Sequence, residues 1–393
     1  MEILLIGNGF DLAHGLPTSY KNFLEFCERA RRIYTYKESA SVAEYARQNL
    51  YGWKMSDEIK GRLVDAYEHR SCIKAYAPDG TYHLNVTTTC GPLDELNTHV
   101  SHNAWLEYFL NCSSYIGENW IDFESEISRV IQTLDSVRVM VNNGGSVMDI
   151  QDSRTDILKA IADSSRVKAQ NVFRDVKAID RFAGFLNTEL ERLIRALEIY
   201  IAEFVGKILI STKNADIEAL NPTHVLSFNY SDTYRRVYGQ GKRIEYDYIH
   251  GKADILKNMA SSNLVLGIDE YLGDDRKDKE LEFLTFKKFY QRIYKSTGNR
   301  YLKWIDDIRN VGLNPTLYIF GHSLDVTDKD ILKLLICNDN VQTKIFYYRE
   351  NEDDKKTLGK LIRNLVRIMG QDELVRRTGS AHKTIEFIPQ SLS

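Results

Sequence analysis

The sequence is poor in the features that mark several classes of protein. Its 393 residues contain only six prolines and no low-complexity tract, which argues against long disordered linkers. The five cysteines form no Cys-x-x-Cys pair, so they indicate neither a disulfide framework nor a zinc site. No apolar run approaches the roughly 20 residues of a membrane span. Lys plus Arg (52) nearly balance Asp plus Glu (55), so no overall basic charge points to nucleic acid.

What remains is the composition of a soluble globular protein. Hydrophobic residues make up 43% of the chain and charged residues 27%. The length allows two or three domains, or one large core with an inserted module. The chain opens directly on an apolar run rather than on a signal peptide, so we expect a cytoplasmic protein that makes no contact with a membrane.

The first twenty residues combine a short apolar run with two glycines. Residues 3–6 are Ile-Leu-Leu-Ile, typical of a strand buried on both faces of a parallel sheet. Gly7 and Gly9 follow, and Thr18 or Ser19 can cap the next helix. A strand, a glycine turn and a helix are the parts with which α/β folds hold a dinucleotide pyrophosphate.

The third glycine of the dinucleotide fingerprint is missing. Leu12 stands at its position, and Gly15 belongs to a separate Gly-Leu-Pro turn. Taken alone, the motif therefore fits a phosphate-binding turn and an ordinary strand–helix turn equally well.

The region from residue 21 to 221 has almost only helical patterns. Its longest periodic segment, 175–212, places apolar residues on one stripe. Other helices are expected at 19–34, 41–50, 56–76, 93–112 and 119–134. We predict a helical domain of residues 21–221, inserted into an α/β domain of residues 1–20 and 222–393.

Beyond Pro222, strands alternate with helices. Strands are expected at 223–228, 244–249, 264–268, 316–320 and 341–348, and helices at 277–310, 328–336 and 352–369. This alternation predicts a Rossmann-type, mostly parallel sheet with right-handed crossovers.

Polar or glycine clusters follow five of the expected strands. They begin at Gly7, Asn229, His250, Gly267 and Gly321. Because the carboxyl ends of parallel strands lie along one edge of a sheet, where ligands bind, the five clusters together predict a nucleotide site.

The same stretches resemble a known family. The motifs are GNGFDLAHGLPTSY at the start, WIDFE at 120–124, SFNYSDTY from Ser227, IHG ending at Gly251, and FGHSLDVTDKDIL from Phe320. They resemble the AbiH family of bacterial abortive-infection proteins, which act against phage. The series of strand ends is also similar to sirtuin-like domains, including antiphage effectors that consume NAD.

This resemblance implies a set of site residues. Asn229 would match the catalytic asparagine, which positions a water or the nicotinamide ribose, and His250 the catalytic histidine, which acts as a general base. NAD would be the substrate or ligand, with no metal. The residues expected to bind it are Gly7, Asn8, Gly9, Asp11, Asp232, Gly321, His322 and Ser323. Taken alone, His250 is more simply interpreted as a hydrogen-bonded core histidine at a strand end, and Asn229 as a turn residue that holds backbone groups. The series of strand ends and the resemblance together favour the catalytic roles.

The chain departs from the sirtuin-like pattern in three places. Ser231 stands two residues after the Asn, where those enzymes usually have Asp. Asp11 stands where many have a small residue. The four-cysteine zinc module of deacylating sirtuins is absent from the sequence, so protein deacylation is not expected.

A serine hydrolase is a rival interpretation. The run ending in Gly321-His322-Ser323 looks like a nucleophile elbow, and Asp372 and His382 follow in the right order, but the closing glycine of the elbow is Asp325. Asp325, with the nearby Asp328 and Asp330, also fits a simpler role as a cap or first-turn acid of the following helix.

Other polar residues have structural interpretations beside functional ones. Asp122, Glu124 and Glu126 could be paired carboxylates for a metal or for acid/base work, although an N-cap acid with Trp120 and Phe123 as anchors is the simpler interpretation. His99 and His102 are expected to be structural. His14 could touch a ligand or pack in its loop.

Two functions therefore stay open. One is an antiphage effector that hydrolyses NAD, with the helical region controlling access or sensing phage. The alternative is a nucleotide-binding sensor, or a toxin of other chemistry such as nucleic-acid cleavage. The expected partners are NAD or a related nucleotide, a phage-derived trigger, and further copies of the chain.

Overall fold

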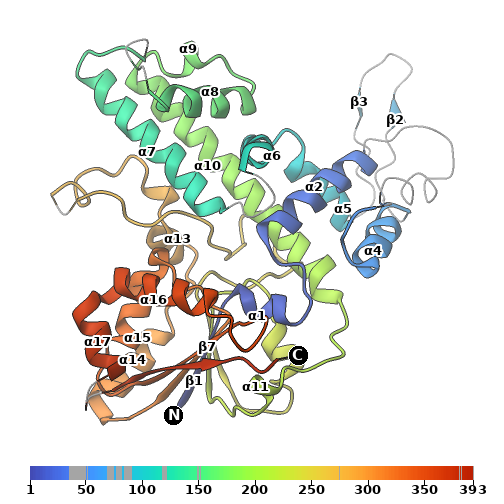
Figure 1. The fold of residues 1–393 in the computed structure, drawn as a ribbon. Helices are drawn as coiled ribbons and strands as arrows, with labels where there is room; N and C mark the ends of the chain where they lie inside the picture. The colour runs from blue at the N-terminus through green and yellow to red at the C-terminus, as the bar shows by residue number, and fades with distance from the viewer. Residues whose placement is uncertain are drawn as a thin grey trace.

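The computed structural model describes residues 1–34, 50, 52–68, 75–76, 82–83, 91–116, 122–147, 150, 152–273, 275–379, 381 and 383–392. This part of the chain contains a six-stranded, all-parallel sheet and a large group of helices (Figure 1). The predicted α/β class with a mostly parallel sheet is confirmed. None of the described helices combines the length and apolarity that a membrane span needs.

The sheet is wound in two directions from its centre. Its strands are β1 Glu2–Ile6, β4 His224–Ser227, β5 Glu245–Tyr248, β6 Thr316–Phe320, β7 Gln342–Tyr347 and β8 Ile385–Pro389. They lie in the order β5-β4-β1-β6-β7-β8. Numbered by their order in the chain, this is 3-2-1-4-5-6, the order of doubly wound nucleotide-binding sheets. The winding reverses between β1 and β6, and ligands of such sheets bind beside that point.

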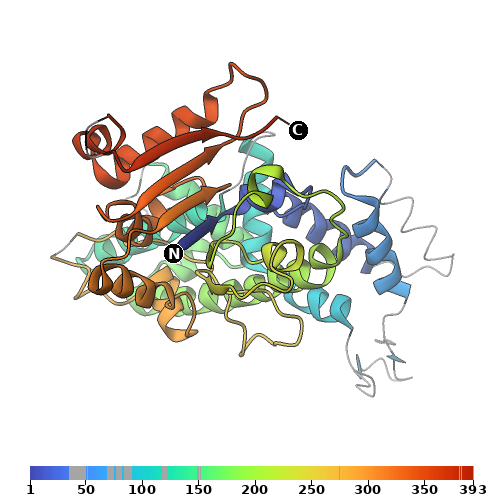
Figure 2. The ribbon, with the colours of Figure 1, turned by 90° about the horizontal axis from the view of Figure 1, so that it is seen from below.

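Both faces of the sheet are buried, as the apolar run at residues 3–6 predicts. Ile3 and Leu5 join one core cluster with the helices after β5, β6 and β7, whereas Leu4 and Ile6 join another. The first face carries α14 Tyr301–Val311, α15 Lys329–Ile336, α16 Lys356–Met369 and α17 Gln371–Gly379. The second carries α1 Asn8–Ala13, α11 Ala215–Glu218 and α12 Thr233–Val237. Seen from below, the orange-red elements near the C-terminus form one outer side of the molecule (Figure 2).

The remaining helices share a separate core and lie beyond one end of the strands. They are α2 Tyr20–Tyr34, α4 Asp57–Glu68, α5 Pro92–Val100, α6 Ala104–Ile116, α7 Phe123–Asn142, α8 Arg154–Ser164, α9 Ala169–Val172 and α10 Val176–Ile199. A π-helical turn, Tyr200–Phe204, and a 3₁₀ turn, Val205–Lys207, continue α10. The strands rise from the N-terminus at the bottom of Figure 1, so their carboxyl ends point toward these helices. The division into two domains at residues 20 and 222 stays a prediction.

The predicted strand at 264–268 is wrong. Only Ile268 forms an isolated bridge, with Lys287, and the segment lies outside the sheet. Side chains supply several of its backbone hydrogen bonds: Gln291 bonds both backbone groups of Leu266, and Lys295 donates to the carbonyl of Leu264. Loop backbone supplies others, such as the carbonyl of His250 for the N–H of Val265. The apolar run at 264–268 is therefore buried in the helical core without strand pairing.

Other predicted elements differ in their bounds. The expected helix at 277–310 is broken into a 3₁₀ turn, Leu284–Phe286, then α13 Lys288–Tyr294 and α14, because Gly298 between them has a φ of 65°. The expected helix at 56–76 ends at Glu68, and Ala75–Tyr76 instead pairs as β2 with β3 Tyr82–His83. Most of the expected helix at 41–50 lies outside the described residues.

Candidate functional site

The glycines of the first and last motifs lie against each other where the winding of the sheet reverses. The N–H of Gly7 donates to the carbonyl of Phe320 at 3.2 Å, and that of Gly9 to the carbonyl of Gly321 at 2.7 Å. A Cβ atom on Gly9 would lie 2.8 Å from the Cα of Gly321, which itself has a φ of 68°. The close approach of two backbone turns therefore requires these glycines, whether or not a ligand also lies there.

The same contact brings His322 beside the first motif. A Cβ atom on Gly7 would lie 2.7 Å from the Cα of His322. Asn8 points to its own loop, because its Oδ1 accepts a hydrogen bond from the hydroxyl of Thr18 at 2.6 Å. Four of the predicted site residues thus meet here: Gly7, Gly9, Gly321 and His322.

Asp328, at the start of α15, lies between two histidines that follow different strands. Its Oδ1 is 3.4 Å from Nε2 of His250, and its Oδ2 is 3.5 Å from Nε2 of His322. Nδ1 of His322 accepts a hydrogen bond from the N–H of Leu324 at 2.9 Å, so the proton of neutral His322 is on Nε2, facing Asp328. One carboxylate therefore orients both imidazoles.

His250 has the environment of a neutral base. It is 5% exposed, and burial lowers the pKa of its imidazole, although Asp328 acts in the opposite direction. Its Nδ1 has no hydrogen-bond partner among the described residues. With Nε2–H directed at Asp328, Nδ1 keeps a lone pair that can accept a proton.

A buried lysine extends this cluster to the helical region. Nζ of Lys288, on α13, lies 3.3 Å from Oδ1 of Asp328 and 2.6 Å from Oε2 of Glu124, on α7. Burial opposes the charge of Lys288, but the two carboxylates raise the pKa of its ammonium above its usual range. Burial raises the pKa of Glu124 to about 7 against the effect of Lys288. The pKa of Asp328 is held well below its usual range, since Lys288 and both histidines outweigh its burial.

A second buried acid, Asp11, lies near Asn229. The Ser231 hydroxyl donates to Oδ2 of Asp11 at 2.6 Å, while Oδ1 of Asp11 and Nδ2 of Asn229 lack a hydrogen-bond partner among the described residues. Asp11 is 1% exposed, and burial raises its pKa to about 6, an effect that Ser231 and the nearby Asn229 reduce. Two positions that depart from the sirtuin-like pattern, Asp11 and Ser231, are thus partners of each other.

The residues on either side of Asn229 contact the histidines. The ring of Phe228 lies 5.5 Å from that of His250 and 4.4 Å from that of His322, between centroids. The ring of Tyr230 lies 6.3 Å from that of His250. Phe228 and Tyr230 therefore lie against the histidines, whereas the side chain of Asn229 lies near Asp11.

The model of the family described as bacteriophage abortive infection AbiH matches residues 3–348, most of the chain. The chain belongs to the AbiH family. Searches among curated proteins and among solved structures gave no match. The family resemblance read from the motifs is thus confirmed, whereas a sirtuin-like domain is not shown.

Two predicted ligand contacts of this AbiH chain are engaged elsewhere. Asp232 hydrogen-bonds the hydroxyl of Tyr248 and lies 3.5 Å from Nζ of Lys252. Ser323 is exposed, and its carbonyl accepts a hydrogen bond from Asn364 at 2.9 Å. Whether either side chain contacts a ligand stays a prediction.

The contacts of Ser323 do not support a hydrolase elbow. No described histidine hydrogen-bonds its hydroxyl, and His382 lies outside the described residues. Asp372 is exposed on α17. Asp325 caps the turn before α15, because its side chain accepts from the N–H of Thr327 at 3.1 Å.

The WIDFE motif has the structural role that its residues suggested. Asp122 caps α7 by accepting a hydrogen bond from the N–H of Glu124 at 3.1 Å, as predicted for an N-cap acid. Phe123 stacks on Tyr20 and Phe109, each with ring centroids 4.2 Å apart. Trp120 lies outside the described residues. The ion pair of Glu124 with Lys288 was not expected, because nothing in the charged stretch around Lys288 sets that lysine apart.

The remaining predicted histidines have structural partners. Nδ1 of His14 lies 2.7 Å from the carbonyl oxygen of Phe10, and its Nε2 lies 2.7 Å from the hydroxyl of Tyr238, which favours packing in its loop. His99 lies 3.7 Å from Glu95 on the same helix.

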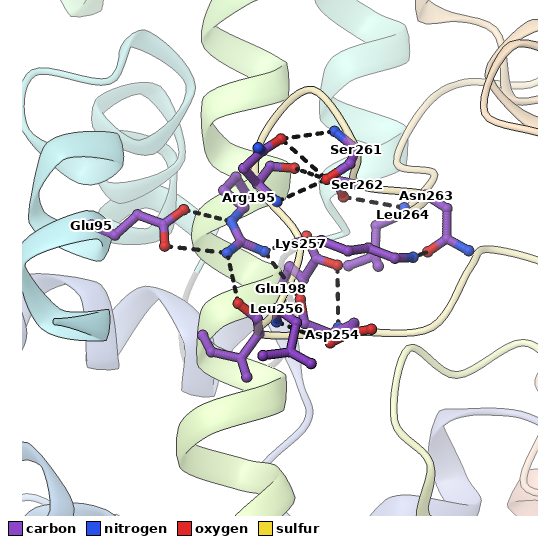
Figure 3. A network of polar contacts seen from close by, with 12 residues as sticks. Glu95, Arg195, Glu198, Asp254, Leu256, Lys257, Ser261, Ser262, Asn263 and Leu264 are labelled. Atoms are coloured by element: carbon purple, nitrogen blue, oxygen red, sulfur yellow. Dashed lines mark hydrogen bonds and ion pairs between the residues drawn. The ribbon is translucent and has the colours of Figure 1, made fainter. Parts of the chain in front are cut away.

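A buried arginine fixes the loop that follows His250. Arg195, on α10, has a fully buried side chain that pairs with Glu95 at 2.7 Å and Glu198 at 2.8 Å (Figure 3). It also donates to the carbonyl of Asp254 at 3.2 Å, and Glu198 accepts from the N–H of Asp254. The helical region therefore holds the chain just beyond His250 in place, as well as contacting the cluster through Glu124.

Proposed function

We propose that this AbiH protein hydrolyses the nicotinamide–ribose bond of NAD at the carboxyl edge of its sheet. The observation that carries the proposal is His250: a buried imidazole oriented by Asp328, with Nδ1 unpartnered. Asn229, at the end of the neighbouring strand and near Asp11, has an unpartnered amide nitrogen among the described residues. Buried polar groups are normally hydrogen-bonded, so these atoms are suited to bind a ligand.

The chemistry needs what these residue types supply. As the bond from the sugar C1′ to nicotinamide breaks, its electron pair leaves with the neutral nicotinamide, and positive charge develops on the ribose. Water then bonds to C1′ and loses a proton to Nδ1 of His250, giving nicotinamide, ADP-ribose and a proton. Asn229 would orient the water or the ribose hydroxyls. The rings of Phe228 and Tyr230 would restrict other water.

The arrangement of the sheet supports a dinucleotide as the ligand. The order of the strands is that of nucleotide-binding sheets, and the winding reverses between the Gly7 and Gly321 turns. Asp11 offers a further unpartnered oxygen on the same edge, suited to a hydroxyl donor. This proposal includes a sirtuin-like character for the α/β part of the chain.

A second candidate is a nucleotide sensor that binds without turnover. Ser231 favours it, because it stands where sirtuin-like enzymes usually have Asp, and its hydroxyl is already used by Asp11. A phage-derived trigger and association of several copies are compatible with both candidates.

The test uses purified full-length protein and two measurements. NAD binding is measured by calorimetry, and nicotinamide release is followed by chromatography, with and without an extract of phage-infected cells. Release that is lost in His250→Ala supports hydrolysis. Binding of NAD without release of nicotinamide under both conditions supports the sensor. If the protein neither binds NAD nor releases nicotinamide, both candidates are contradicted.

A further inference from the structure

Helix α16 carries a stripe of positive charge. Lys356, Lys360, Arg363 and Arg367 are all exposed. Their spacing of four, three and four residues places them along one side of the helix. The helix contains no acidic residue.

Within the described part of the chain, Lys356 lies near Asp354 and helps to lower the pKa of that acid, but no such partner is seen for Lys360, Arg363 or Arg367. None of the four side chains forms an ion pair with another described residue. Like charges at such spacings repel one another on a helix. The acids nearest in sequence, at 350–354, precede the helix, and the stripe runs away from them toward Arg367. The whole chain has a net charge of −3, so the stripe is a local feature.

Helices α14 and α15 carry further cations. Lys329 and Lys333 of α15, with Arg309 of α14, line a hollow of about 800 Å³. These three side chains also form no ion pair with a described residue. Two of the three acids that line the hollow are paired with other arginines. Helices α15 and α16 pack side by side on the same face of the sheet.

We propose that the exposed stripe of α16 binds the phosphate backbone of a nucleic acid. The stripe spans about 16 Å of helix, at 1.5 Å per residue, long enough to meet several successive phosphates. Arginine and lysine contacts of this kind set affinity and position without reading sequence. The proposal is independent of NAD hydrolysis.

A membrane fits this surface less well than a nucleic acid. Leu361, Leu365 and Ile368, which form the apolar side of α16, are buried in the core and cannot enter a bilayer. The exposed apolar residues of the helix are Ile362 and Val366, and neither is aromatic. Helices that lie in a membrane surface need a free apolar face, often with Trp or Phe.

The surface adjoins the candidate site. Nδ2 of Asn364, on α16, donates to the carbonyl of Ser323 in the turn after β6. A nucleic acid bound along the stripe would therefore lie next to the carboxyl edge of the sheet.

The test measures binding of fluorescein-labelled 30-mers by polarisation between 50 and 200 mM KCl, using single-stranded RNA, single-stranded DNA and duplex DNA. If four phosphates are engaged, the slope of log K against log salt is about −2.8 for single strands and about −3.6 for duplex. A variant with Lys356, Lys360, Arg363 and Arg367 all changed to Gln should bind at least about tenfold more weakly at 50 mM, with a much shallower slope.

A matched control separates the stripe from overall charge. Changing Lys159, Lys168, Lys177 and Arg181 in the helical region to Gln removes the same four charges and should leave binding unchanged. Circular dichroism verifies that both variants fold. Equal loss in both variants, or absence of binding by the wild type, overturns the proposal. So does stripe-dependent binding to phosphatidylserine vesicles without binding to any oligonucleotide.

Discussion

Nε2 of His250 lies 3.4 Å from Oδ1 of Asp328, and this contact joins the turn after β5 to the start of α15. The carboxylate favours the charged form of the imidazole, while burial favours the neutral form and prevails, so that the pKa of His250 is lowered. Asp328 therefore orients His250 without holding it protonated at neutral pH.

The variant Asp328→Asn tests this positioning role through a pH profile. If His250 is the base, nicotinamide release by the wild type falls only below the ordinary histidine pKa of about 6.5. Removing the carboxylate removes an influence that raises the pKa of His250, so the acid limb should move to still lower pH. The rate should fall by up to about 10²-fold through misorientation. An unchanged limb, or one moved to higher pH, would show that Asp328 does not act through His250.

The glycine contact between the first and last motifs predicts a stability effect. Gly9→Ala places a Cβ atom 2.8 Å from the Cα of Gly321, so two turns must move apart, at a cost of about 1–3 kcal/mol in the free energy of unfolding. Gly184→Ala is the control, because a Cβ atom at that exposed position of α10 would have no heavy atom within 4 Å. Alanine there should stabilise the helix and raise the free energy of unfolding by about 0.5–1 kcal/mol. Urea unfolding measures both. A Gly9→Ala variant as stable as the wild type would mean that the two turns are not closely packed.

The cluster around Lys288 predicts a large penalty for removing its cation. Lys288→Met leaves Asp328 and Glu124 buried without their partner, which should cost about 3–5 kcal/mol. Lys60→Met, which breaks an exposed pair with Asp57, should cost at most about 0.5 kcal/mol. Equal effects in urea unfolding at pH 7 would contradict the buried cluster.

Glu124 adds a dependence on pH. Its folded pKa is raised to about 7 from an ordinary value of 4.5, so the folded state binds more protons than the unfolded state between these values. Stability from this group is therefore lost as pH rises from about 4.5 to 7. Glu124→Gln removes that loss. Relative to the wild type, the free energy of unfolding of the variant should therefore be higher at pH 7.5 than at pH 5. The same difference at both values would place the Glu124 pKa near its ordinary value.

The sheet was largely predictable, and the reasons are physical. Residues 3–6 form an unbroken apolar run because the central strand is buried on both faces. A glycine or polar cluster follows β1, β4, β5 and β6. The run at 264–268 has the same composition but is buried in the helical core, and composition does not distinguish the two environments. Strand β8 was missed, because Ile385–Pro389 mixes polar and apolar residues and ends in proline.

The candidate site was predictable only along the sheet. Asn229 and His250 follow strands, and parallel strands bring their carboxyl ends to one edge. Asp328 gave the sequence signal of a helix-cap acid, which does not reveal that its side chain turns to two histidines. Lys288 and Glu124 come from α13 and α7, helices that do not belong to the faces of the sheet, and no periodicity predicts that these two side chains meet Asp328.

Release of nicotinamide from NAD in cells under phage challenge tests the central claim most directly, because a protein that kills its host can be silent when purified. Cells carrying the wild type should be depleted of NAD after infection. In cells carrying His250→Ala, the rate of NAD cleavage should be lower by on the order of 10²–10⁴-fold, as for removal of a general base. Asn229→Ala should also lose activity, and Ser323→Ala should keep most of it. The reverse order, with Ser323→Ala inactive and His250→Ala active, would contradict NAD hydrolysis at His250. So would unchanged NAD levels in infected cells that the wild-type protein protects from phage.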